Sequence, residues 1–205
     1  MMSVESTAAA GSAARLGVKS AAVVLASLLL GGLTSFAQSS LGPLDPLANS
    51  SSGWTLLTAL IIWFAREPTL PSAVFGPVSF VSLVLGYTVA AALRGLTYNP
   101  LMFGVIGLVV GPFVGVAVAW LRCRGPRAAA GAALLSGIAV GEGLYGLIVV
   151  SRSTGWFYWT AIAVLGIALL VVTLVKRSVA ARDVLLGAGG TALVAVAFYA
   201  TYTSL

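Results

Sequence analysis

A single acid lies inside a long apolar run in the second half of the chain. Glu142 is at the centre of "IAVGEGLYG", residues 138–146, and Tyr145 follows three positions later. On a helix these two side chains share a face, so the phenol can donate a hydrogen bond to the carboxyl group. A carboxylate inside a bilayer costs at least about 2.5 kcal/mol, so it is expected to face the bundle interior, meet a partner or take up a proton. Two interpretations stay open: a solute-binding or proton-binding site, and a structural hydrogen bond between helices.

Other polar and aromatic residues lie at similar depths in neighbouring apolar runs, biased toward the side that the charge pattern makes external. They could line a cavity open to that side, with Arg94 as the expected cationic partner of Glu142. Helix ends at the membrane surface are hydrated, which accounts for the outermost of these polar residues. It does not account for Tyr87 or Glu142, which lie deeper. The candidate cavity or solute-binding residues are Glu142, Tyr145, Tyr87, Arg94, Gln38, Asn49 and Trp54.

The sequence lacks most of the residues and motifs that enzymes use for catalysis. With no histidine, neither a Ser-His pair nor a zinc site has its base or ligands. The single cysteine, Cys123, has no neighbouring group that completes a mechanism, and no P-loop is present. We therefore predict no catalytic residue, no metal and no cofactor, and an enzyme is the least favoured class of function.

The composition is that of an integral membrane protein. Of the 205 residues, 60% are hydrophobic and 8% charged, and the mean hydropathy is +1.07, whereas soluble domains carry about 25% charged residues. The net charge of +6 is explained by Lys and Arg in cytoplasmic loops, so nucleic acid is not an expected partner.

Uncharged runs long enough to cross a bilayer can be counted directly, since a spanning helix needs about 20 residues. They predict an all-α membrane bundle with one domain, residues 18–205, after a short cytoplasmic tail, residues 1–17. The second run is the weakest, and it could instead be re-entrant. The seven expected spans are 18–37, 49–65, 73–93, 101–121, 128–150, 156–175 and 184–202.

Basic residues alternate between the two sides of this predicted bundle. Eight of the 11 Lys and Arg residues fall in the N-terminal segment and the even-numbered connections, and a ninth, Lys19, lies just inside the first span on the same side. Only Arg94 and Arg152 fall on the other side. The positive-inside rule then predicts a cytoplasmic N-terminus and an external C-terminus in a bacterial plasma membrane. The first span also resembles a secretory signal, with small residues before Gln38. Its removal would leave six spans with the same orientation.

Glycines repeat every fourth position on two of the expected helices. Small residues at this spacing let helix backbones approach closely, which holds helices together in lipid. These glycines could serve packing within the chain or a dimerisation face, and we expect the two helices to form the tight centre of the bundle. The helix-packing residues predicted are Gly107, Gly111, Gly115, Gly137 and Gly141.

The segments "GGLTSFAQSSLGPLDPLANSSSGWTLLTALIIWFAREP" and "VLGYTVAAALRGLTYNPLMFGVIGLVVGPFVGVA" resemble an uncharacterised family of small multi-pass membrane proteins from actinobacteria. The resemblance covers nearly the whole chain and implies an inner-membrane location. It implies no activity, substrate or cofactor, and it transfers no functional residue.

Two functions follow as alternatives. The first is a small-solute binding or transport subunit with an outward-facing polar cavity around Glu142. The second is a structural or assembly subunit whose glycine-lined helices bind other membrane proteins. The partners expected are the lipid bilayer, a small-molecule ligand, and a second copy or another membrane protein.

Overall fold

The computed structural model describes residues 2–38, 40–177 and 180–204, and these residues form helices and turns only. A 3-10 helix, η1 (Gly42–Asn49), precedes α2, and a π-helical segment, η2 (Gly146–Val150), joins α5 to α6. The α-helices are α1 (Met2–Ala37), α2 (Ser51–Ala65), α3 (Thr69–Leu93), α4 (Leu101–Trp120), α5 (Pro126–Tyr145), α6 (Ser151–Thr154), α7 (Phe157–Arg177) and α8 (Ala181–Thr203).

Within these described residues, six helices are long and apolar enough to cross a membrane, which supports the predicted all-α multi-pass class. They include the continuous helix Pro126–Thr154 formed by α5, η2 and α6. The helix expected over residues 49–65 is α2, which has 15 residues. At 1.5 Å per residue it is about 22 Å long, short of the roughly 30 Å of a hydrocarbon core. The N-terminal residues expected as a tail continue α1, which begins at Met2.

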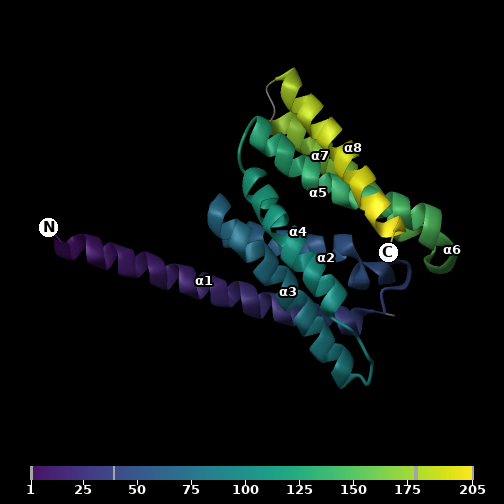
Figure 1. Cartoon of the computed structure of the whole chain (residues 1–205), viewed down its shortest axis with the longest axis horizontal. Helices are drawn as coiled ribbons and strands as arrows, with labels where there is room; N and C mark the ends of the chain where they lie inside the picture. Colours follow the sequence, from purple (N-terminus) through teal and green to yellow (C-terminus); the bar gives the residue numbers. More distant parts are fainter. Residues whose placement is uncertain (1, 39, 178–179, 205) are drawn as a thin grey trace.

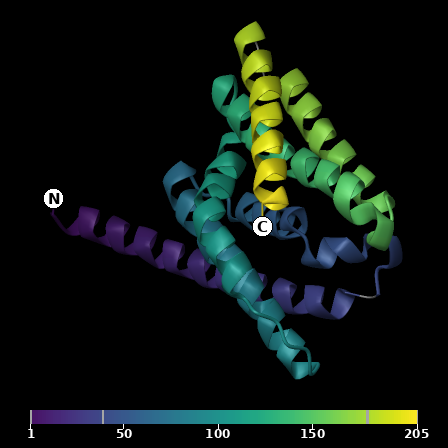
Figure 2. The same cartoon turned by 45° about the vertical axis from the view of Figure 1, so that its right-hand side comes forward.

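The long helices form two groups of three. α3 packs between α1 and α4, and α5 packs between α7 and α8. Figures 1 and 2 show the α5, α7 and α8 group inclined away from the α1, α3 and α4 group, with α4 and α5 meeting at one end. α2 contacts both groups, through α3 and α4 on one side and α5 on the other.

The first group is held together by backbone contacts at glycines. A Cβ atom added to Gly76 of α3 would lie 1.9 Å from the carbonyl oxygen of Gly111 in α4, and one added to Gly115 would lie 1.9 Å from that of Ser72. Gly107 faces the Phe80 ring in the same interface. These three glycines of α4 therefore face α3.

The second group has the same kind of interface on α5. A Cβ added to Gly137 would lie 2.5 Å from Cβ of Val194, and one added to Gly141 would lie 2.8 Å from the Ala195 carbonyl oxygen, both on α8. The glycines of α4 and α5 thus contact α3 and α8 respectively. They do not bring α4 and α5 together as the centre of the bundle.

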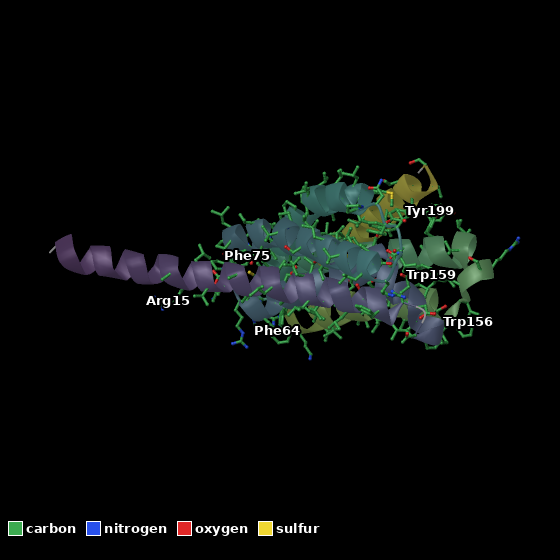
Figure 3. The ribbon with its side chains drawn as sticks, turned by 90° about the horizontal axis from the view of Figure 1, so that it is seen from below. Arg15, Phe64, Phe75, Trp156, Trp159 and Tyr199 are labelled. Carbon is green, nitrogen blue, oxygen red and sulfur yellow. The ribbon has the colours of Figure 1, made fainter. Side chains whose placement is uncertain are left out.

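α1 and α2 run antiparallel, as two successive crossings require. Lys19, at the middle of α1, pairs with Glu67, just after the end of α2, at 2.5 Å. Arg122, after α4, donates to the Trp63 and Ile62 carbonyls and lies 4.8 Å from the Trp63 ring centroid. One end of the molecule therefore gathers the connections in which most basic residues lie. Figure 3 shows Arg15 and Phe64 toward this end, and Trp156, Trp159 and Tyr199 toward the other.

Candidate functional site

Glu142 binds the beginning of α2. Its side chain is 3% exposed, and its two carboxyl oxygens accept hydrogen bonds from backbone N–H groups. Ser51 N donates to Oε1 at 2.8 Å, and Ser52 N donates to Oε2 at 2.6 Å. A helix N-terminus carries unpaired N–H groups and a partial positive charge, so it is a good partner for an acid. Glu142 thus has a backbone partner inside the bundle where a cationic side chain was expected.

The remaining N–H groups at the start of α2 are also satisfied. Ser50 is the N-cap residue: its hydroxyl accepts from Gly53 N at 3.0 Å, and its carbonyl accepts from Trp54 N at 3.0 Å. Gly53 allows η1 to pack here, because a Cβ on it would lie 2.0 Å from the Leu47 carbonyl oxygen. The helix can therefore begin in a buried position with no free donor among its first four N–H groups.

Two tyrosines from the second helix group hold the same turn. The Tyr158 hydroxyl of α7 is 2.5 Å from the Ser50 hydroxyl, and the Tyr202 hydroxyl of α8 is hydrogen-bonded to the Ser51 hydroxyl. Tyr145 does not bind Glu142 through its hydroxyl in any contact among the described residues; its ring lies edge-on to Tyr202, with the centroids 5.4 Å apart. The N-terminal turn of α2 is thus bound by α5, α7 and α8 together.

The helix that carries Glu142 changes geometry directly after the site. Residues 146–150 form the π-helical segment η2, a feature frequent near functional sites. Gly146 at its start lies flat against Trp159, since a Cβ there would fall 1.9 Å from the indole ring. This contact fixes α5 against α7 beside Glu142.

The other aromatic candidates form a second cluster, where α2 packs against α3. The Trp54 ring lies 5.5 Å from the Tyr87 ring and 6.4 Å from the Phe80 ring, and the Tyr87 hydroxyl donates to the Gln38 side chain. Tyr98, in the connection between α3 and α4, packs 4.7 Å from Tyr87, and burial raises the pKa of Tyr98 to about 12. Trp54 therefore links this cluster to the Glu142 turn three residues earlier.

The last two candidates make no hydrogen bond to either cluster among the described residues. Arg94 donates to the carbonyl and hydroxyl of Ser35 at the end of α1, and its guanidinium lies 5.5 Å from the centre of the Phe36 ring. Asn49, the last residue of η1, is exposed. The seven candidate residues thus lie at the first turn of α2, in the Trp54–Tyr87 cluster and at the end of α1.

A large apolar cavity opens next to the Glu142 turn, between α4 and α8. It has a volume of about 710 Å³, and its walls also include residues of α2, α3 and α5. Most of the lining is aliphatic or aromatic, for example Met102, Val105, Ile106, Phe113, Ile138 and Phe198. Its polar lining consists of four hydroxyl-bearing residues: Ser51, Thr55, Thr201 and Tyr202. We call this space the α4–α8 cavity.

Ser51 joins the cavity to the buried acid. Its N–H donates to Glu142, its hydroxyl binds Tyr202, and both Ser51 and Tyr202 line the α4–α8 cavity. The lining contains no charged side chain, and no group of three His, Cys, Asp or Glu residues within the described ranges could hold a metal ion. The arrangement is suited to binding an apolar molecule, with hydrogen bonds available at one end.

Sequence reasoning found Glu142 but missed its partners, the backbone N–H groups of Ser51 and Ser52. It also missed the hydroxyl contacts of Tyr158 with Ser50 and of Tyr202 with Ser51. One signal for them was present: a serine run directly before an apolar stretch marks a helix start, whose N–H groups attract an acid. The sequence did not predict the α4–α8 cavity, because most of the side chains that line it are apolar and come from several helices, as on any membrane helix.

A family described as "Family of unknown function (DUF6518)" matches residues 10–205 of this chain. No curated protein and no solved structure matches this chain.

Proposed function

Since the chain belongs to a family of unknown function, DUF6518, we propose from its own geometry that it is a binding or transport protein for an apolar small molecule, embedded in a bacterial plasma membrane. The α4–α8 cavity carries this proposal. Its volume of about 710 Å³ lies within the range of small-molecule sites, about 300–1,000 Å³.

The composition of the lining favours a molecule that reaches the site through the bilayer. α4 and α8 are both long enough to span a membrane, so a space between them is reached from the lipid. Residues such as Ala197 and Val105 of the lining are exposed. A water-soluble solute would leave these apolar walls without a matching surface.

Glu142 has a positioning role in this proposal. It holds the first turn of α2, and with it Ser51 and Thr55, at the wall of the cavity. In many transporters the N-terminus of an interrupted helix faces an anionic group of the substrate at a central site; here the N-terminus of α2 faces the chain's own Glu142.

The alternative, an assembly subunit that binds partners through glycine-lined helices, has less support. Gly107, Gly111 and Gly115 already contact α3, and Gly137 and Gly141 already contact α8. These faces are therefore occupied within the chain.

Photolabelling tests the binding proposal. The purified chain in lipid nanodiscs is irradiated with a diazirine-bearing alkane, and labelled residues are mapped by mass spectrometry. We expect labelling of Met102, Ile106 and Phe198 to reach a plateau as the probe concentration increases. Labelling of Leu165, which is 64% exposed and faces the lipid, should rise linearly with probe concentration.

Ala197→Phe places a ring in the cavity from an exposed lining position and should abolish the saturable component. Ala192→Phe, also exposed on α8 but outside the lining, is the matched control. Linear labelling throughout the wild-type chain, or an equal effect of the two variants, would refute the proposal.

A further inference from the structure

The wall of the α4–α8 cavity contains a largely buried threonine whose hydroxyl has no partner among the described residues. Thr55 is 7% exposed and lines the cavity, and in the part of the chain that the structure describes its hydroxyl makes no hydrogen bond. Helical threonines usually donate to the carbonyl four residues earlier, as Thr88, Thr191 and Thr201 do here. Thr55 does not, so one donor and one acceptor at the cavity wall are available to a ligand.

A second donor lies one turn away on the same wall. Ser51 and Tyr202 share one hydrogen bond between two hydroxyl groups. Because each hydroxyl carries one hydrogen and only one of the two hydrogens is used, the pair keeps a spare donor. The polar lining can therefore both donate to a ligand and accept from it.

The remaining cavity wall is apolar and extends away from these hydroxyls. Leu134 of α5 lines the cavity eight residues before Glu142, which contacts Ser51. At 1.5 Å per residue this distance along α5 is about 12 Å. Phe113 lines the cavity twelve residues after Leu101 on α4. The cavity thus has a hydrogen-bonding end and a hydrocarbon end, which is the polarity of an amphipathic lipid.

The charge of the ligand follows from the lining. It contains no Lys, Arg, Asp or Glu, so a charged headgroup would be transferred into apolar surroundings without a counter-ion. We propose that the α4–α8 cavity binds a neutral amphipath, a hydrocarbon chain with an uncharged hydroxyl headgroup, with this headgroup bound at Thr55 and the Ser51–Tyr202 pair. This inference rests on the binding function proposed above.

Competition among three ligands of equal chain length tests the headgroup. Hexadecan-1-ol, hexadecane and hexadecanoate each compete with the diazirine-bearing alkane in nanodiscs, and the saturable labelling of Ile106 and Phe198 is measured. One hydrogen bond changes an affinity by roughly three- to tenfold. We expect the alcohol to compete at a mole fraction lower by that factor than either hexadecane or hexadecanoate.

Two threonine variants separate recognition from folding. Thr55→Val removes the proposed headgroup contact without changing the side-chain shape, and it should make the alcohol no better than the alkane. Thr58→Val is the matched control, because Thr58 lies on the same helix, is fully buried without a hydroxyl partner among the described residues, and does not line the cavity. Thr58→Val should keep the preference for the alcohol.

The possible outcomes distinguish the two proposals. Saturable labelling that all three competitors displace equally, with no effect of Thr55→Val, overturns the headgroup inference and leaves the binding function standing. Strongest competition by hexadecanoate overturns the neutral headgroup. If the wild-type chain shows no saturable labelling, the binding function itself fails.

Discussion

Glu142 is a helix cap placed inside a membrane bundle. Each carboxyl oxygen accepts one backbone N–H of α2, so the acid replaces the water that would solvate a helix start at a surface. This geometry explains how a chain with five acidic residues can keep one of them buried at mid-depth without a cationic side chain.

Replacement of Glu142 should destabilise the fold in a graded way. In Glu142→Gln the amide nitrogen meets a backbone donor, so one of the two bonds is lost, and hydrogen bonds to charged groups contribute about 1.5–3 kcal/mol. Glu142→Leu loses both bonds and should cost more. The free energy of unfolding in mixed detergent micelles measures both effects.

Glu67→Gln is the matched control for this series. Its partner Lys19 is 44% exposed, and surface ion pairs contribute at most about 1 kcal/mol. A larger loss of stability for Glu67→Gln than for Glu142→Gln would contradict the capping role.

The Ser51–Tyr202 contact should appear as an energetic coupling. Ser51→Ala and Tyr202→Phe each remove one side of the same hydroxyl bond, at about 0.5–1.5 kcal/mol each. Because they share that bond, the double variant should cost less than the sum of the single variants. Strict additivity in the same unfolding assay would show that the two hydroxyls do not interact.

At the scale of elements, η1 and α2 occupy the position where the sequence predicts the second membrane span. η1 leads from the end of α1 to the buried N-cap at Ser50, and α2 continues from there to the Lys19 end. Sequence could predict the weakness of this segment, because its uncharged apolar part is short. It could not predict the cause, since Glu142 is 91 residues from Ser51 in the chain and its partners are backbone groups.

The glycine interfaces give a sharp prediction about α4. Gly111→Ala should destabilise the fold, because the added Cβ would lie 2.5 Å from Pro77 backbone atoms of α3. Gly104→Ala is the control on the same helix, with nothing within 4 Å of its added Cβ. Alanine favours a helix over glycine by up to about 1 kcal/mol, so Gly104→Ala should be neutral or stabilising. Equal thermal stabilities for the two variants would contradict the close approach of α3 and α4.

At the scale of the whole molecule, two groups of three helices meet around α2. Composition predicts the all-α membrane class and the long spans, because the hydropathy and length of each segment can be read without its neighbours. The arrangement of the groups and the α4–α8 cavity depend on helix crossings at glycines that could face either neighbour. The sequence pattern therefore identified the packing residues without identifying their partners.

The topology of seven crossings that we infer from the charge pattern predicts which positions are accessible outside the cell. A membrane-impermeant maleimide should not label Cys123, the single cysteine, in intact cells. It should label Thr154→Cys and Ser204→Cys in a Cys123→Ser background, since both residues are exposed at the opposite end from the Lys19–Glu67 pair. Labelling of Cys123 from outside would show that α2 does not complete a crossing.

The central claim is that the α4–α8 cavity holds a lipid-like ligand, and native mass spectrometry of the purified chain tests it most directly. We predict that the wild-type protein and Ala192→Phe each retain a bound neutral molecule, seen as added mass. Ala197→Phe should lose this added mass, because its new ring projects into the cavity. An unliganded wild-type protein, or a bound mass retained equally by Ala197→Phe, would contradict the claim.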